Sequence, residues 1–273
     1  MKKILAFIIF MFLIVNCVYA GTDKCSEEYL KGKTHFSLTR YIAERAVKKE
    51  IKKVLKKQTG ANFDVKFEGY TLTSIKKGIF KYIEITGENA VLEDITIPYA
   101  NLKSITDYNY IDYTKNPVAF KSDMTYSYEI MLSDESINTA LKDSDYKKVL
   151  DKVNNIAKPF FVITGVRTKI VNNKFYIITD YNFPIAIAKD RSFVAQSDFE
   201  VVKGVIKAKN VSIDTAYGNL GLNKVANLIN YLNPIEFTID ELEKAGHKAI
   251  IENVNIVDNK VKIGGKIYIK GER

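Results

Sequence analysis

Phe63-Asp64-Val65-Lys66-Phe67-Glu68 is the stretch that decides the fold class, because apolar and charged residues alternate in it without interruption. Alternation with a period of two puts one set of side chains on each face of an extended chain, so this stretch predicts a half-buried β-strand. It follows a segment with the apolar spacing of a helix, which runs from about residue 38 to residue 57 and ends at Gly60. The change of period marks the start of a β-rich region.

Strand-like stretches dominate the chain from there on. They are expected at residues 78–86, 89–97, 99–105, 125–131, 160–170, 174–181, 184–188 and 200–213, with a closing hairpin of 248–257 against 260–270. The tyrosine-rich residues 106–120 are expected to form a long loop or an edge extension. Because the helices lie between groups of strands and do not alternate with them one by one, the pattern predicts an antiparallel α+β fold.

Two further helices are expected after the first group of strands. One covers about 134–156, with Ser133 as its N-cap and a possible interruption at 143–145, and the other covers 219–231. Residues 169–177 and 255–263 are similar to each other, since each reads as a strand, an Asn/Asp-Asn tight turn and a returning strand. Gly264 and Gly265 lie within a strand context and predict a bulge.

Composition indicates a globular protein, and the charge distribution argues against a nucleic-acid-binding one. The chain has 273 residues, of which 47% are hydrophobic and 27% are charged, an ordinary globular composition. Of the net charge of +9, residues 1–20 contribute +2 and residues 21–60 contribute +6, from eleven Lys/Arg against five Asp/Glu. A nucleic-acid-binding protein spreads positive charge over its main domain, so we expect no nucleic-acid partner.

The N-terminus has the features of a secretory signal. Lys2 and Lys3 precede an apolar run, residues 4–15, and Val18-Tyr19-Ala20 resembles a cleavage site. The apolar run is shorter than the roughly 20 residues of a transmembrane helix. We therefore expect a signal peptide over 1–20, a flexible segment over 21–37 and a single domain over 38–273, exported to the periplasm or cell envelope.

The two cysteines leave two processing routes open. Cleavage after Ala20 would remove Cys17 and leave Cys25 as the lone thiol, so that no intramolecular disulfide forms. In the alternative, Ile14-Val15-Asn16-Cys17 serves as a lipoprotein-type processing site and Cys17 carries a lipid anchor.

The first helix combines an apolar stripe with a basic face. Either the basic face is solvated, or it contacts anionic lipid head groups, to which each basic side chain near the surface contributes roughly 1 kcal/mol. The apolar stripe consists of Ala43, Val47, Ile51, Val54 and Leu55, and the candidate membrane-contact residues opposite it are Lys48, Lys49, Lys52, Lys53 and Lys56.

A search for catalytic motifs finds no support for an enzyme. There is no Gly-x-Ser-x-Gly elbow and no phosphate-binding glycine motif, and His35 and His247 lack a nearby nucleophile signature. Two cysteines and two histidines also make a conventional zinc cluster unexpected. We expect no catalytic residues, no metal and no cofactor.

Three stretches resemble the LmeA-type bacterial phospholipid-binding proteins. They are Gly69-Tyr70-Thr71-Leu72-Thr73-Ser74-Ile75-Lys76-Lys77-Gly78-Ile79-Phe80-Lys81-Tyr82-Ile83-Glu84-Ile85, the capped helix start Leu132-Ser133-Asp134-Glu135-Ser136-Ile137-Asn138-Thr139-Ala140-Leu141, and the terminal hairpin Val254-Asn255-Ile256-Val257-Asp258-Asn259-Lys260-Val261-Lys262-Ile263-Gly264-Gly265. The resemblance implies a curved, strongly twisted antiparallel sheet wrapped around a long helix, an apolar groove that holds phospholipid, and no catalytic residue.

Strands that are apolar on both faces, at 160–163 and 183–188, need cover on both sides, from other protein layers or from a bound acyl chain. Our first hypothesis is therefore an exported phospholipid-binding or lipid-transfer protein. The alternative is an envelope protein–protein interaction module with a fully packed interior, for which Tyr108, Tyr110 and Tyr113 would be the contact residues. The candidate groove-lining residues under the first hypothesis are Ile79, Phe80, Ile83, Ile85, Phe160, Phe161, Ile163, Ile185 and Ile187.

Overall fold

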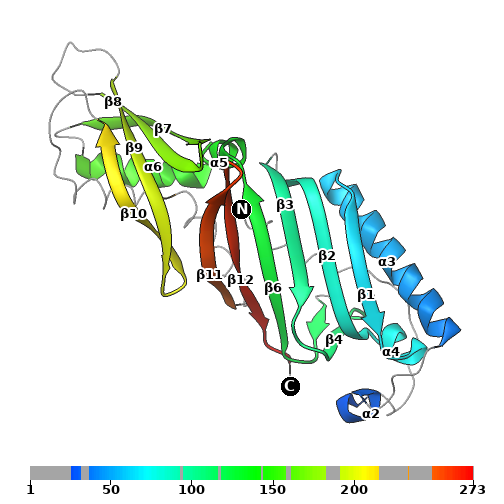
Figure 1. Ribbon diagram of the computed structural model, residues 1–273. Coiled ribbons are helices and arrows are strands. Elements are labelled where there is room, and N and C mark those ends of the chain that lie inside the picture. The colour runs from blue at the N-terminus through cyan, green and yellow to red at the C-terminus, as the bar shows by residue number, and fades with distance from the viewer. Residues whose placement is uncertain are drawn as a thin grey trace.

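The computed structural model describes residues 26–31, 37–92, 95–115, 118–142, 144–157, 161–182, 191–214, 233 and 248–272. It confirms an α+β fold whose sheets are antiparallel, open and twisted (Figure 1). The predicted strand at 184–188 and the predicted helix at 219–231 lie outside the described residues, as does the signal segment 1–20 with Cys17.

Within the described residues, the larger of two sheets has eight strands, all paired antiparallel. Strands run in the order β11-β12-β6-β3-β2, followed by β4 and β5, while β1 pairs with the other side of β2. Their bounds are β1 (Phe63–Gly69), β2 (Ile79–Leu92), β3 (Ile95–Ser104), β4 (Asn109–Asp112), β5 (Ala119–Phe120), β6 (Met124–Leu132), β11 (Lys248–Val257) and β12 (Lys260–Ile269). The short strands β4 and β5 are the edge extension expected within residues 106–120.

Strand β2 is longer than the sequence pattern indicates. Gly87-Glu88-Asn89 reads as a turn between two strands, but β2 runs through it, and Gly87 pairs with Phe63 of β1 and with Ala100 of β3. A Cβ on Gly87 would lie 2.2 Å from the Phe63 ring. The glycine therefore makes room for an aromatic ring inside the sheet, and the expected break at this point is wrong.

The second sheet has four strands in the order β10-β9-β8-β7. Its strands are β7 (Val162–Val171), β8 (Lys174–Asn182), β9 (Arg191–Val202) and β10 (Val205–Asp214). The single strand expected at 200–213 is wrong, because Lys203 and Gly204 both have positive φ, 55° and 81°, and form a tight hairpin turn. A lysine in the left-handed region gives no strong turn signal in sequence, which explains the error.

The helices are α2 (Glu27–Lys31), α3 (Leu38–Thr59), α4 (Leu72–Lys76), α5 (Asp134–Ala140) and α6 (Ser144–Ala157). The predicted end of α3 is confirmed: Gly60 has φ 70° and its N–H donates to the Lys56 carbonyl. The cap of α5 is also confirmed, since the Ser133 hydroxyl accepts from the Ser136 N–H. Helix α4 is not expected from the sequence; a capping box between Thr71 and Ser74 starts it.

Figure 1 places α3 along β1 at one end of the large sheet, and the four-stranded sheet at the other end beyond β11. Ile51 and Leu55 of α3 are buried against the sheet, with Ala43 and Val47 partly buried beside them, as the predicted apolar stripe requires. The Glu44 carboxylate, 9% exposed, accepts a hydrogen bond of 2.9 Å from the Gly69 N–H at the end of β1. These contacts fix the orientation of α3 about its own axis.

Two asparagines on the helices cover the free edge of β7. Asn138 of α5 accepts from the Thr168 N–H at 2.7 Å and donates to the Thr168 carbonyl at 2.9 Å. Asn154 of α6 makes the same pair of bonds with Ile163, at 2.7 and 2.9 Å. Each amide side chain thus bonds to β7 in the way that the backbone of a neighbouring strand would. These bonds pair backbone groups of Thr168 and Ile163 that the sheet edge would otherwise leave unpaired.

The double glycine of β12 lies at a bulge, as expected, but the extra residue is on the partner strand. Ile251 pairs with Gly265 and Asn253 pairs with Gly264, so Glu252 of β11 is the inserted residue. A Cβ on Gly265 would lie 2.0 Å from the Ile250 carbonyl oxygen. Glycine is therefore required here because the backbone of β11 comes too close for any side chain.

Candidate functional site

The predicted groove-lining residues do not form one wall. Phe80, Ile83 and Ile85 of β2 lie together in the main core. Ile79 packs in a separate small cluster with Leu30 and Tyr70, and Ile163 packs in a third cluster with Val153 and the half-buried Phe161. Phe160, Ile185 and Ile187 lie outside the described residues.

A continuous inward face crosses the large sheet at the level of Ile85. Cross-strand pairing places Val65, Ile85, Leu102, Tyr128, Gly265 and Ile251 side by side on six successive strands. All six residues are buried. In the next row Phe67 pairs with Ile83, and the Ile83 N–H donates to Ser104 Oγ at 3.0 Å. From Ser104 the row continues by pairing through Tyr126, Ile267 and Ala249, and all six residues are buried as well. The strands β1, β2, β3, β6, β12 and β11 thus share one apolar face, with two tyrosines near its centre.

Tyr126 and Tyr128 differ in what their hydroxyls contact. The Tyr126 hydroxyl donates to Asn109 Oδ1 at 3.5 Å and contacts Met124 Sδ at 3.4 Å. The Tyr128 hydroxyl is buried and has no hydrogen-bond partner among the residues that the structure describes. Burial raises the pKa of Tyr128 to about 12, with a smaller contribution from the negative charge of Glu252. Tyr128 therefore stays protonated at neutral pH and keeps a donor that the described residues leave unused.

A second unused hydroxyl lies on the inward face of the small sheet. Thr179 of β8 is fully buried, and its Oγ1 likewise finds no partner within the described ranges. Most buried polar groups in folded proteins are hydrogen-bonded, so each exception calls for an explanation. Sequence reasoning missed Tyr128 and Thr179. For Tyr128 the available signal was the alternation Tyr126-Ser127-Tyr128, which puts two phenols on the same face of a strand.

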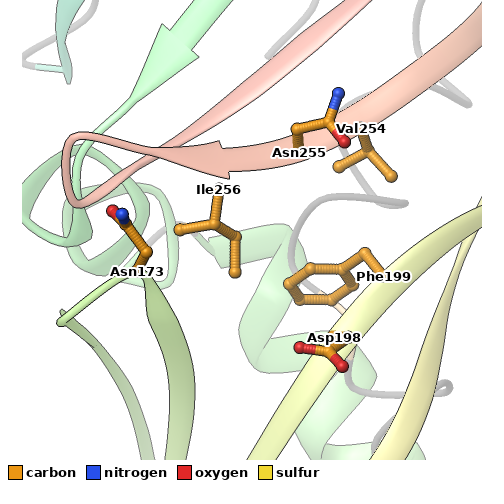
Figure 2. A pocket seen from close by; sticks show the side chains of 6 residues that line it. All are labelled: Asn173, Asp198, Phe199, Val254, Asn255 and Ile256. Carbon is orange, nitrogen blue, oxygen red and sulfur yellow. The ribbon is translucent and has the colours of Figure 1, made fainter.

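A small pocket lies where the two sheets meet (Figure 2). Its volume is about 230 Å³, below the roughly 300–1,000 Å³ of sites for drug-sized ligands. Figure 2 shows Phe199 of β9 and Ile256 of β11 on facing sides of this space. The remaining lining residues are Asn173, Asp198, Val254 and Asn255, and no predicted groove residue is among them.

The basic face of α3 is partly neutralised by the protein itself. Lys52 pairs with Asp64 of β1 at 3.0 Å, and Lys53 lies 3.6 Å from Glu50. The hydrogen bond from Lys52 is the main reason why the pKa of Asp64 lies below its ordinary value. Lys49, Lys53 and Lys56 are exposed and Lys48 and Lys52 are half-buried, so the five predicted contact residues do not share one environment.

The described residues offer no metal site or membrane span. They contain no group of three or more His, Cys, Asp or Glu side chains arranged to hold a metal ion. Among the helices in the ranges given above, none is long and apolar enough to cross a bilayer. His35 and His247 lie outside those ranges.

The tyrosines of the alternative hypothesis are used within the fold. Tyr108 and Tyr110 are half-buried and pack against the cluster of Leu30, Tyr70 and Ile79. The Tyr113 hydroxyl donates to the Lys76 carbonyl. These rings attach α2 and α4 to the sheet, so they are not fully available as contact residues.

Comparisons with known proteins return no relative. No family model matches the chain, and no curated protein and no solved structure is significantly similar to it. The resemblance to the LmeA-type proteins therefore stays a prediction from the three motifs.

Proposed function

We propose that this chain is an exported, non-catalytic protein of the cell envelope that binds or transfers phospholipid at an anionic membrane surface. In this proposal the large sheet curves around α3, and its apolar face is one wall of a groove for acyl chains. The proposal places the head group or ester region of the lipid within reach of the Tyr128 hydroxyl.

The observation that carries the proposal is the buried Tyr128 hydroxyl, for which the described residues supply no hydrogen-bond partner. Leaving a buried hydroxyl without a hydrogen bond costs about 1–3 kcal/mol, which a fully packed interaction module would have no reason to retain. The ester and phosphate oxygens of a phospholipid are hydrogen-bond acceptors, and a neutral phenol is a donor. A lipid that reached the row of Ile85, Leu102 and Tyr128 would therefore satisfy the hydroxyl. Its acyl chains would have to displace the protein atoms that bury these side chains in the structure.

The energetics of lipid exchange require such a wall. A two-tailed phospholipid has about 30 methylene groups, and each contributes about 0.8 kcal/mol on leaving water. A soluble carrier competes with a membrane only if it offers the tails a similarly dry environment. The buried rows on β1, β2, β3, β6, β12 and β11 supply apolar side chains of the kind such an environment needs.

The first test is chemical extraction of the protein as purified from cells, followed by mass spectrometry of the extract. We expect phospholipid in an amount comparable to that of the protein, and binding of a fluorescent phospholipid after delipidation. Absence of both lipid and binding would refute the proposal and leave the interaction module as the better description.

A pair of tyrosine substitutions tests the role of Tyr128. Tyr128→Phe should weaken phospholipid binding about two- to tenfold, the equivalent of one hydrogen bond. In the delipidated protein it should raise the unfolding free energy by about 1–3 kcal/mol, because it removes the unpaired hydroxyl. Tyr126→Phe is the matched control, because its hydroxyl contacts Asn109 and Met124. It should lower stability by about 1 kcal/mol and leave lipid affinity unchanged. Equal effects of both changes on binding would remove the argument from Tyr128.

A further inference from the structure

The first turns of α3 expose three large apolar side chains. Leu38 is 65% exposed, Tyr41 is 51% exposed and Ile42 is 59% exposed. Leu38 and Ile42 are the two most exposed large apolar side chains in the part of the chain that the structure describes. The spacing i, i+3, i+4 puts the three side chains next to one another on the helix surface.

These side chains cannot turn inward, because the opposite side of α3 is held by the sheet. Glu44 binds the Gly69 N–H at 2.9 Å, and Ile51 and Leu55 are buried in the core. At 100° per residue, Leu38 and Ile42 lie roughly opposite this buried side. The exposure of the apolar turn therefore follows from the way in which the rest of the helix packs.

The same outward stripe continues as a row of cations. Arg45, Lys49 and Lys56 follow Leu38 at i+7, i+11 and i+18, close to whole turns of the helix, and all three are exposed. Within α3, eight Lys/Arg residues stand against Glu44 and Glu50. Along the outward face of α3, apolar side chains come first and positive charges follow. This combination complements the surface of an anionic bilayer, in which negatively charged head groups cover an apolar interior.

We propose that Leu38, Tyr41 and Ile42 insert into the boundary between head groups and acyl chains of an anionic bilayer, while Arg45, Lys49 and Lys56 contact the lipid phosphates. This inference rests on the proposed function and deepens it by naming the part of the protein that enters the membrane. An interfacial helix typically buries its apolar face about 5–10 Å deep, and two signals, apolar and electrostatic, hold it more firmly than either alone.

The inferred orientation brings one end of the molecule to the membrane. Helix α4 packs against α3, and Figure 1 shows α2 and α4 near the start of α3, at the end of the large sheet far from β7–β10. The strands β1 and β2, which carry Val65 and Ile85, are then the part of the apolar face nearest to the bilayer. A lipid leaving the membrane would meet this part first.

Tryptophan fluorescence gives a direct test, because the chain contains no tryptophan. Ile42→Trp places a single probe on the inserted turn. Val257→Trp is the matched control, since Val257 is 40% exposed and lies at the tip of the β11–β12 hairpin. The probe at position 42 should shift to the blue on vesicles of equal parts phosphatidylglycerol and phosphatidylcholine, and the probe at position 257 should not.

A second measurement uses the apolar side chains themselves. The double variant Leu38→Ser, Ile42→Ser should weaken binding to these vesicles about tenfold or more, because less apolar area leaves water. Its fold is expected to be unchanged, since both side chains face solvent, and far-UV circular dichroism checks this. The amount of lipid extracted from the purified variant should equal that of the unchanged protein.

The outcomes separate this inference from the proposed function. Lipid in the purified protein without a blue shift at position 42 would overturn the inserted turn and leave lipid binding intact. A blue shift with no bound lipid would support insertion and refute the phospholipid carrier. A blue shift that follows protein concentration and needs no vesicles would overturn the inference in favour of contact between two copies of this chain.

Discussion

Asn173 and Asn259 exchange two hydrogen bonds across the junction of the two sheets. The backbone N–H of each residue donates to the side-chain Oδ1 of the other, and both distances are 2.9 Å. Both residues have positive φ, 56° and 55°, in the tight turns of the hairpins β7–β8 and β11–β12. The two segments that are similar in sequence therefore form the same turn, and each turn presents the donor and the acceptor that the other needs.

Removing one of these side chains should loosen the junction. We expect Asn173→Gly to lower the free energy of unfolding by about 0.5–1.5 kcal/mol, the range for one hydrogen bond, because glycine keeps the left-handed backbone but lacks the acceptor. Urea unfolding measures the change. Asn172→Gly is the control: Asn172 has φ 52° in the same turn, and its side chain makes no hydrogen bond within the described part of the chain. An equal loss in the control would mean that glycine flexibility, and not the bond, is responsible.

Asn138 should be among the most sensitive polar positions, because its amide makes both a donated and an accepted bond with Thr168. Asn138→Asp keeps the acceptor for the Thr168 N–H but puts a second oxygen against the Thr168 carbonyl. We expect a loss of about 1–3 kcal/mol and faster hydrogen exchange at the Thr168 amide. Unchanged exchange at that amide would show that β7 does not depend on this bond.

Glu84 should make stability depend on pH in the acid range. Burial raises its pKa, but hydrogen bonds from Tyr82, Lys66 and Asn101 outweigh this effect and leave the pKa below its ordinary value of 4.5. As pH falls, the unfolded chain therefore takes up a proton at Glu84 at a higher pH than the folded chain does. The stabilisation from ionised Glu84 is present above the ordinary pKa and is lost as pH falls through the lowered pKa of the folded state.

Urea unfolding at about pH 7 and about pH 3 tests the contribution of Glu84. Glu84→Gln should be less stable than the unchanged protein near neutral pH, and the difference should shrink at the lower pH. Glu88→Gln is the control, an exposed carboxylate on the same strand. A difference that stays constant with pH would contradict the assignment.

The lysines of α3 should contribute to membrane binding through charge. Lys49→Gln, Lys53→Gln and Lys56→Gln together should weaken binding to phosphatidylglycerol-containing vesicles by about 3 kcal/mol, roughly a hundredfold, and less at high salt. The control changes three exposed lysines elsewhere, Lys174, Lys207 and Lys270, to glutamine and removes the same net charge. Equal weakening by both triple variants would indicate a nonspecific effect of net charge.

Local patterns predicted most of the elements because those elements depend on neighbours in the chain. The period-two alternation of 63–68 appears as β1, and Ser133 and Gly60 mark a helix start and a helix end as expected. The errors occur where a distant residue decides the conformation. Gly87 remains in β2 because the Phe63 ring occupies the space of its missing side chain, and Lys203 adopts a turn conformation that its own propensity disfavours.

The candidate site was less accessible to sequence reasoning than the fold. Buried aliphatic residues such as Ile79, Ile83 and Ile163 were predictable as buried, but their division among three clusters depends on which strands become neighbours. Burial alone also cannot distinguish Tyr126 from Tyr128. Asn109, brought in from β4, gives the Tyr126 hydroxyl an acceptor from another strand, whereas the described residues supply no partner for the Tyr128 hydroxyl.

By itself, the sequence determined the α+β class, the basic first helix and the two similar hairpin turns, since periodicity, charge and turn residues are local properties. The tertiary structure alone decided that Asn173 meets Asn259, that the Tyr128 hydroxyl finds no partner among the described residues, and that Leu38 and Ile42 face outward. The physical reason is that hydrogen bonds and burial between distant segments depend on which elements pack together, and many packings share one local pattern.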